Sequence, residues 1–171
     1  MLRSFAMATL LALSTPFIVH AAPGHDAKPF GQAAPASQAK RTVTITLKDN
    51  LYEPKSVTVK AGEVVRFVLV NKGELLHEFA VGRPEDHAEH QKMMAMMLEH
   101  GMITPTKIDH EKMKMPMGGG HDHGATSGSV LVEPGKRGEL TWKFAQTTTL
   151  QFACTIPGHY ESGMVGEFRF Q

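Results

Sequence analysis

Short stretches in which polar and apolar residues alternate make up most of two blocks of the chain. Residues 42–47 have the sequence Thr-Val-Thr-Ile-Thr-Leu, which puts Val43, Ile45 and Leu47 on one face, as in a half-buried strand. Residues 64–70 form a richer apolar run, typical of a strand within a sandwich core. The further strand-like runs are residues 56–59, 76–81, 129–132, 138–144, 149–153 and 165–170. About eight short strands separated by turn residues predict an all-β sandwich rather than alternating strands and helices.

Residues 83–128 interrupt this pattern. The segment has few β-branched residues, many charges and a glycine run. Residues 84–86 (Pro-Glu-Asp) resemble a helix start with acidic side chains in the first turn, which predicts a helix over 85–100. A shorter helix is expected after Thr104 or Pro105. We interpret the segment as an insertion in the sandwich, partly helical and partly flexible.

The first 21 residues have the features of an export signal. Arg3 precedes a largely apolar stretch, residues 5–19, and small or apolar residues occupy the cleavage positions before residue 22. A retained membrane anchor is the alternative, but the apolar stretch is short for a spanning helix and Ser-Thr-Pro at 14–16 interrupts it. We expect an exported protein, located in the periplasm of a Gram-negative host, without membrane insertion once the signal is removed.

Residues 22–40 are rich in Ala, Pro, Gly and Gln and are expected to form a flexible linker. Residues 41–171 then form one domain with the insertion at 83–128, because about 150 residues after the signal suffice for one sizeable core. The formal net charge is only +1. A chain so close to neutral has no strong electrostatic attraction to nucleic acid or to an anionic membrane.

Cys154 is the only cysteine. In an exported protein it is therefore buried and inert, paired with another chain, or held by a metal. His159 and Met164 follow it closely, with Pro157-Gly158 forming a turn. His77, on a distant predicted strand, is the candidate fourth ligand. Two His and one Cys in a trigonal plane, with a long weak axial Met, form a blue-copper site.

The segments around these residues resemble those of cupredoxins, the family of plastocyanin, azurin and pseudoazurin. The matching pieces are residues 52–55 (Tyr-Glu-Pro-Lys), 57–63 (Val-Thr-Val-Lys-Ala-Gly-Glu), 76–79 (Leu-His-Glu-Phe) and 154–164. The resemblance spans residues 42–82 and 129–170. It implies a Greek-key β-sandwich that holds one type 1 copper.

The resemblance also assigns roles to the four candidate ligands. His77, Cys154 and His159 would be equatorial metal ligands and Met164 the axial one, with the ring edge of His159 as the electron port. Many cupredoxins place Asn directly after the first His, where it steadies the ligand loop by hydrogen bonding, whereas this chain has Glu78. The insertion is absent from small electron carriers and makes the chain more similar to exported cupredoxins associated with bacterial copper tolerance.

Each ligand also has a simpler interpretation. Cys154 is alternatively a small buried hydrophobe, His77 a hydrogen-bonded strand histidine, and Met164 a core side chain. Zinc also accepts Cys and His. The complete set of four in an exported β protein favours copper.

The insertion concentrates a second set of metal-binding side chains, eight of the 11 methionines and six of the 10 histidines. They are Met93, Met94, Met96, Met97, Met102, Met113, Met115 and Met117, with His87, His90, His100, His110, His121 and His123. Thioethers bind Cu(I) and imidazoles bind either oxidation state, which predicts additional, labile copper. The alternative is packing, because Met at helical spacing commonly fills cores.

The sequence therefore predicts a periplasmic type 1 copper protein that supports copper tolerance. Its partners would be copper ions and a redox or copper-handling protein. A dedicated electron-transfer carrier between redox enzymes, with the insertion as docking surface, is the alternative function. An oxidase or reductase would need further copper centres or a second domain, so we expect no enzymatic activity.

Overall fold

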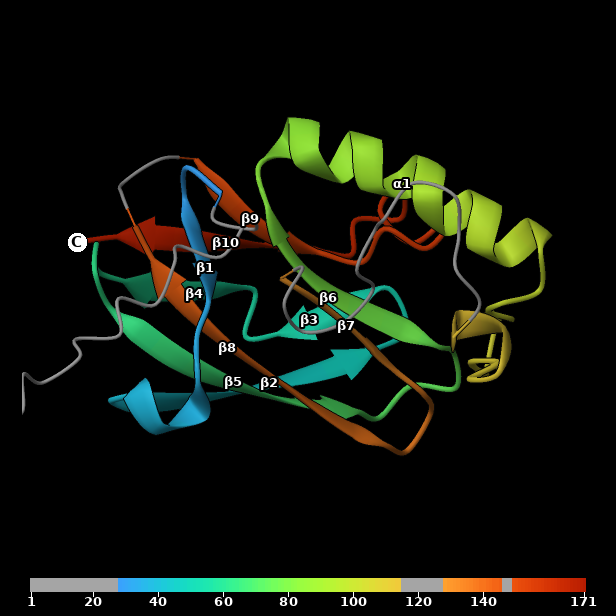
Figure 1. Cartoon of the computed structure of the whole chain (residues 1–171), viewed down its shortest axis with the longest axis horizontal. Helices are drawn as coiled ribbons and strands as arrows, with labels where there is room; N and C mark the ends of the chain where they lie inside the picture. The colour runs from blue at the N-terminus through green and yellow to red at the C-terminus, as the bar shows by residue number, and fades with distance from the viewer. Residues whose placement is uncertain (1–27, 115–127, 146–148) are drawn as a thin grey trace, which may run out of the picture.

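Two five-stranded sheets pack face to face and form the body of the protein (Figure 1). The computed structural model describes residues 28–114, 128–145 and 149–171, so the predicted signal at 1–21 lies outside the described residues. One sheet has the order β1-β8-β5-β2-β3 and the other β4-β10-β9-β6-β7. The strands are β1 (Gly31–Ala33), β2 (Arg41–Lys48), β3 (Leu51–Glu53), β4 (Ser56–Val59), β5 (Val64–Asn71), β6 (His77–Gly82), β7 (Ser129–Val132), β8 (Arg137–Phe144), β9 (Leu150–Ala153) and β10 (Val165–Phe170).

The predicted β-sandwich is confirmed. Every predicted strand is present within a residue or two of its expected bounds. The pairs β2–β5 and β4–β10 are parallel, and the other pairs are antiparallel. Only β1 and β3, each of three residues, were not predicted, because so short a run shows no periodicity.

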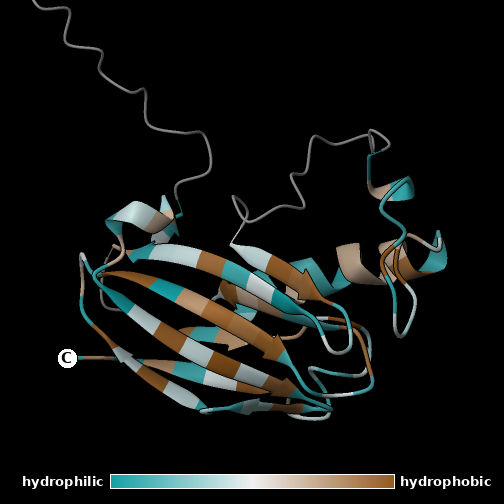
Figure 2. Ribbon diagram, turned by 90° about the horizontal axis from the view of Figure 1, so that it is seen from below, coloured by the Kyte–Doolittle hydropathy of each residue, from teal (hydrophilic) through white to brown (hydrophobic). Residues whose placement is uncertain are grey.

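The polar–apolar alternation appears as bands of hydropathy along the strands in Figure 2, and in β5 it corresponds to burial of one face. Along β5 the side chains of Val65, Phe67 and Leu69 are fully buried, and the residues between them are only half-buried. Tyr52 meets Phe152 edge to face with ring centroids 5.1 Å apart. Such aromatic contacts add to the large apolar area that these rings remove from water.

The prediction of a flexible linker is wrong for residues 28–40. Strand β1 pairs with β8, and a short 3-10 helix, η1 (Ala36–Gln38), follows it. Phe30 is 1% exposed and stacks against Trp142 with ring centroids 6.1 Å apart. One aromatic side chain anchors this segment, and a single anchor produces no pattern in the sequence.

The insertion begins with one helix, α1 (Pro84–Glu99), which confirms the helix predicted over 85–100. The Asp86 carboxylate accepts a hydrogen bond from the Arg83 amide at the helix start (3.0 Å), and Gly101 with φ of 65° follows the last turn. The helix leaves β6 and lies along one end of the sandwich (Figure 1).

Within the described residues up to 114, no α-helix follows Thr104 or Pro105, where a shorter helix was expected. Ile103 and Ile108 pair in an isolated bridge, and a 3-10 turn, η2 (Lys112–Lys114), comes after it. Residues 115–127, which contain the glycine run of the part expected to be flexible, lie outside the described residues. Within the ranges that the structure covers, no helix combines the length and apolarity needed to cross a membrane.

The anchoring of the first described segment predicts a specific stability loss. Phe30→Ala leaves a cavity against Trp142 and should lower the free energy of unfolding by about 3 kcal/mol. Gln32→Ala, at an exposed position of the same strand, should change it by less than about 0.5 kcal/mol. Urea unfolding followed by tryptophan fluorescence measures both. Equal stabilities of the two variants would mean that residues 28–33 do not anchor to the sandwich.

Candidate metal centre

The predicted site is assembled from two places that are adjacent only in the fold. His77 is the first residue of β6, which lies between β7 and β9 in its sheet. The other three side chains come from the cysteine loop (residues 154–164), which joins β9 to β10. The loop is closed at its base by a hydrogen bond from the Cys154 amide to the Met164 carbonyl (3.1 Å).

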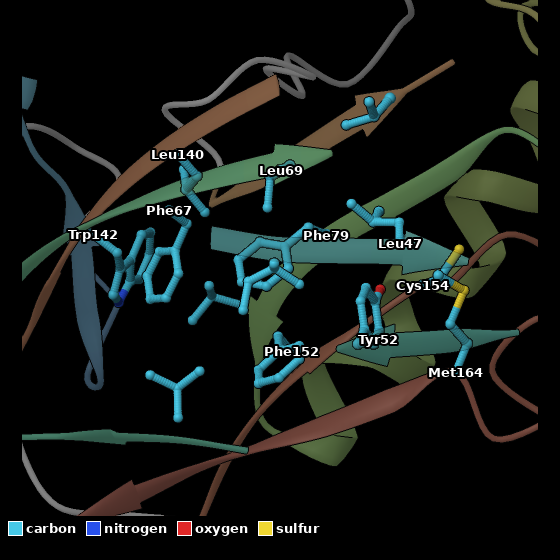
Figure 3. Close-up of a cluster of buried hydrophobic side chains, with 14 of the residues drawn as sticks. Leu47, Tyr52, Phe67, Leu69, Phe79, Leu140, Trp142, Phe152, Cys154 and Met164 are labelled. Carbon is cyan, nitrogen blue, oxygen red and sulfur yellow. The ribbon is translucent and has the colours of Figure 1, made fainter. Parts of the chain in front are cut away.

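Two glycines let the cysteine loop turn back on itself. Gly158 has φ of 87° and Gly163 has φ of 90°, a conformation that other residues adopt only at a cost. These turns place His159 and Met164 on the same side of the loop as Cys154. In Figure 3 Cys154 and Met164 lie together at the end of the hydrophobic core away from Trp142.

The structure brings three of the predicted ligand atoms together. One atom each from His77, Cys154 and His159 lies within 4.8 Å of the others. The Cys154 sulfur is 3.2 Å from Nδ1 of His159, and the two imidazole centroids are 5.1 Å apart. Met164 is fully buried beside them. His77 and Cys154 are also fully buried, and His159 is half-buried.

Asp49 fixes the orientation of the His77 ring. Its carboxylate lies 3.0 Å from Nε2 of His77 and also accepts hydrogen bonds from the amides of Glu74 and Leu75. Nδ1 of His77 is buried and has no hydrogen-bond partner within the described ranges. A histidine held by a carboxylate through one nitrogen, with the other nitrogen free, is typical of a metal ligand.

The protonation states also suit a metal. Burial lowers the pKa of His77 more than the neighbouring Asp49 raises it. Burial and the nearby His77 ring lower the pKa of His159, so both imidazoles are neutral at neutral pH. Burial and the charge of Glu78 raise the pKa of the Cys154 thiol well above its usual range. Without metal the thiol is protonated, and a bound metal displaces that proton.

Glu78 occupies the position at which many cupredoxins have Asn, and it also stabilises the ligand loop by hydrogen bonding. Its carboxylate is buried and accepts hydrogen bonds from the amide (3.0 Å) and hydroxyl (2.6 Å) of Thr155. Ser129 donates to the same carboxylate, and Nε2 of His90 lies 2.6 Å from it. The Glu78 amide also donates to the Cys154 sulfur (3.3 Å). Strand β6 and the cysteine loop are therefore joined by both main chain and side chain.

The charge of Glu78 is stabilised by these partners. Burial alone would raise its pKa, but the charge of His90 and the hydrogen bonds from His90, Ser129 and Thr155 lower it to about 2. Burial lowers the pKa of His90, whereas the Glu78 carboxylate raises it above its ordinary value. The two side chains form a partly buried carboxylate–imidazole pair between β6 and α1.

Sequence reasoning missed Asp49 and His90 as partners of the site. Asp49 gave no signal, because its relation to His77 depends on a turn that sequence spacing does not show. His90 was counted among the metal-binding side chains of the insertion. An acid such as Glu78 within an apolar strand needs a partner when it is buried. This requirement was the one signal in the sequence that pointed to a residue such as His90.

Some methionines and histidines of the insertion are buried in the structure, and others are exposed. Met94, Met97 and Met102 belong to the hydrophobic core, so packing explains them. Met96 is 37% exposed, and His100 is exposed as well. His110, also in the described part of the insertion, is exposed too. Met115, Met117, His121 and His123 lie outside the described residues.

The donor set of the site fits copper. It offers two neutral imidazoles, one thiol and one thioether, and soft sulfur ligands with imidazole are the combination of blue-copper sites. Asp49, the exposed carboxylate nearest to His77, is engaged with the outer nitrogen of that ring. A hard oxygen-binding cation would find no carboxylate among these four donors.

The chain is similar to characterised proteins. The cupredoxin-like domain family matches residues 10–89. The copper-resistant cuproprotein CopI of Pseudomonas aeruginosa is 47% identical over 179 residues, which cover 99% of this chain and 98% of that protein. The protein of the same name from Rubrivivax gelatinosus is 35% identical over 145 residues, covering 84% of this chain and 74% of its own length.

Two auracyanins of known structure share the fold. Auracyanin B matches with a TM-score of 0.58 and 20% identity, over 83% of this chain and 96% of its own. Dithionite-reduced auracyanin from Roseiflexus castenholzii matches with a TM-score of 0.54 and 22% identity, over 78% of this chain and 98% of its own. At these identities the likeness establishes the β-sandwich fold.

Proposed function

The chain belongs to the family of copper-resistance cuproproteins, and from that premise we propose that it holds one redox-active copper ion and supports copper tolerance in the periplasm. The observation that carries the proposal is the convergence of His77, Cys154 and His159 within 4.8 Å of one another. The free, buried Nδ1 of His77 supports it.

In this proposal the four predicted side chains have distinct roles. His77 and His159 through Nδ1 and Cys154 through its sulfur would hold the copper, and the Met164 thioether would be a fourth, weaker donor. Copper supplies one-electron redox chemistry at this place. The protein excludes water through the burial of three of these side chains and fixes their geometry through the closed cysteine loop. A rigid site lowers the rearrangement that a change of oxidation state requires.

The half-buried ring of His159 supports electron exchange with a partner. It is the one member of the four that reaches the surface of the described structure. A dedicated electron carrier remains the second candidate function on this ground. Copper tolerance is favoured because a relative that matches almost the whole chain is named for copper resistance.

We further propose that the insertion binds additional copper at its exposed side chains. Met96, His100 and His110 are exposed in the described part, and thioether and imidazole groups bind Cu(I) without a rigid cage. This copper would be labile, since none of the three is held in a buried set of ligands.

The copper centre is tested by changing the thiolate and the thioether separately. Cys154→Ser should abolish the intense visible band of the oxidised copper protein, because charge transfer from the thiolate produces that band. Met164→Leu should keep the band and raise the reduction potential, since the axial donor tunes it. Visible spectra and redox titration measure the two effects. A full-strength band in Cys154→Ser would exclude this sulfur as a ligand.

Copper tolerance is tested with the same variants in cells. In a Pseudomonas aeruginosa strain that lacks its CopI, the wild-type chain should restore growth on copper, and Cys154→Ser should not. Growth under respiratory conditions without added copper is the control. Restored respiration without any change in copper tolerance would favour the electron carrier instead.

The labile copper is tested by a matched pair of variants. Met96→Leu combined with His100→Ala and His110→Ala should lower the number of Cu(I) ions bound by the reduced apoprotein and leave the visible band unchanged. Met94→Leu combined with Met97→Leu removes two core thioethers at nearly constant volume and should leave the Cu(I) number unchanged. Titration against a Cu(I) chelator gives both numbers. An equal decrease in bound Cu(I) in the two variants, or no decrease in the first, would contradict copper binding at Met96, His100 and His110.

A further inference from the structure

Helix α1 contacts the metal centre through the residues that follow two of the four proposed ligands. Glu78 follows His77 in β6, and Thr155 follows Cys154 in the cysteine loop. The hydrogen bonds from Thr155 to the Glu78 carboxylate, 2.6 and 3.0 Å long, therefore fix the distance between the two ligand-bearing backbones. Any displacement of this carboxylate displaces Thr155 and, with it, Cys154.

The carboxylate is positioned from the side of the insertion. His90, in the second turn of α1, places Nε2 2.6 Å from Oε1 of Glu78. Ser129 of β7 donates to the same oxygen, and Thr155 donates to the other oxygen. Each oxygen thus has its own donors, and the helix supplies the imidazole among them.

Two further contacts join α1 to the cysteine loop. The Gln91 amide donates to the Glu161 carboxylate (2.7 Å), and the other Glu161 oxygen accepts from the Gly158 amide (3.1 Å). The ring of His87 lies 6.0 Å from the ring of Tyr160, centroid to centroid. Figure 1 shows the helix running beside the red loop that connects β9 and β10. The N-terminal half of the helix therefore contacts the cysteine loop at Tyr160 and Glu161.

We propose that α1 is a positioning element of the metal centre, with His90 acting through Glu78 on Thr155 and Cys154. This inference rests on the proposed copper site and assigns the insertion a second role besides labile copper binding. His90 and Glu78 are positioning residues, since neither reaches the proposed metal. The insertion cannot then be removed or reoriented without changing the centre.

The first test uses the metal-free protein, so its outcome does not depend on copper. His90→Leu removes the donor and should accelerate hydrogen exchange of the Thr155 amide about ten-fold or more, because hydrogen bonds to charged groups are among the stronger ones. His90→Gln keeps an N–H donor near the position of Nε2 and should stay close to the wild-type rate. Lys92→Ala is the control, since Lys92 is exposed on the same helix and pairs only with Glu89 among the described residues.

The second test uses the copper-loaded protein. In His90→Leu the visible absorption maxima should move and copper should be released faster, whereas His90→Gln and Lys92→Ala should match the wild type. If His90→Leu does not fold, His90→Asn, whose amide is too short to reach Glu78, takes its place. Circular dichroism and thermal melting establish folding.

The outcomes separate this inference from the proposed function. Wild-type exchange and wild-type absorption maxima in His90→Leu would overturn the positioning role, as would equal effects of His90→Leu and Lys92→Ala. Faster exchange with unmoved maxima would also overturn it, because the contact would then stabilise the fold alone. A wild-type protein without a visible band would refute the copper centre, while the exchange rates in the metal-free protein would still decide whether α1 holds the loop.

Discussion

A buried carboxylate, that of Glu78, imposes the constraint on which the metal centre depends. A charge in the protein interior is costly unless several partners satisfy it. Its donors come from three segments, Ser129 of β7, His90 of α1 and Thr155 of the cysteine loop. These segments must meet at one point before the carboxylate can be buried. The backbone amide of Glu78 donates a hydrogen bond to the Cys154 sulfur, so the carboxylate and the proposed ligand are linked through one residue.

The site therefore combines two kinds of support. The hydrophobic core holds Met164 and Cys154 at its end (Figure 3), which gives the sulfur atoms a dry and rigid environment. The polar groups set orientation, as Asp49 does for His77. A copper site needs both, because soft ligands must be kept from water while the imidazoles must present the correct nitrogen. Membership of the copper-resistance cuproproteins supports copper as the cofactor for this arrangement.

Much of the fold was predictable, because alternation with a period of two is visible without tertiary information. The cupredoxin resemblance is confirmed by the family match and the shared fold. The sequence failed where one residue acts alone, as Phe30 does in anchoring the segment expected to be a linker. It also failed where one residue type has two possible roles. Met94 packs in the core and Met96 is exposed, yet both belong to the Met/His set of the insertion, for which the sequence allowed either metal binding or packing. The partnership of His90 with Glu78 depends on how α1 lies across the sandwich, which no local pattern encodes.

The central claim is that four side chains from two remote segments hold a single copper ion. The most direct measurement is anomalous diffraction at the copper edge from crystals of the copper-loaded protein. The account predicts one fully occupied peak at bonding distance from Nδ1 of His77, the Cys154 sulfur and Nδ1 of His159, with the Met164 sulfur farther away. A copper peak that lies only on the insertion, with these atoms unbound, would contradict it.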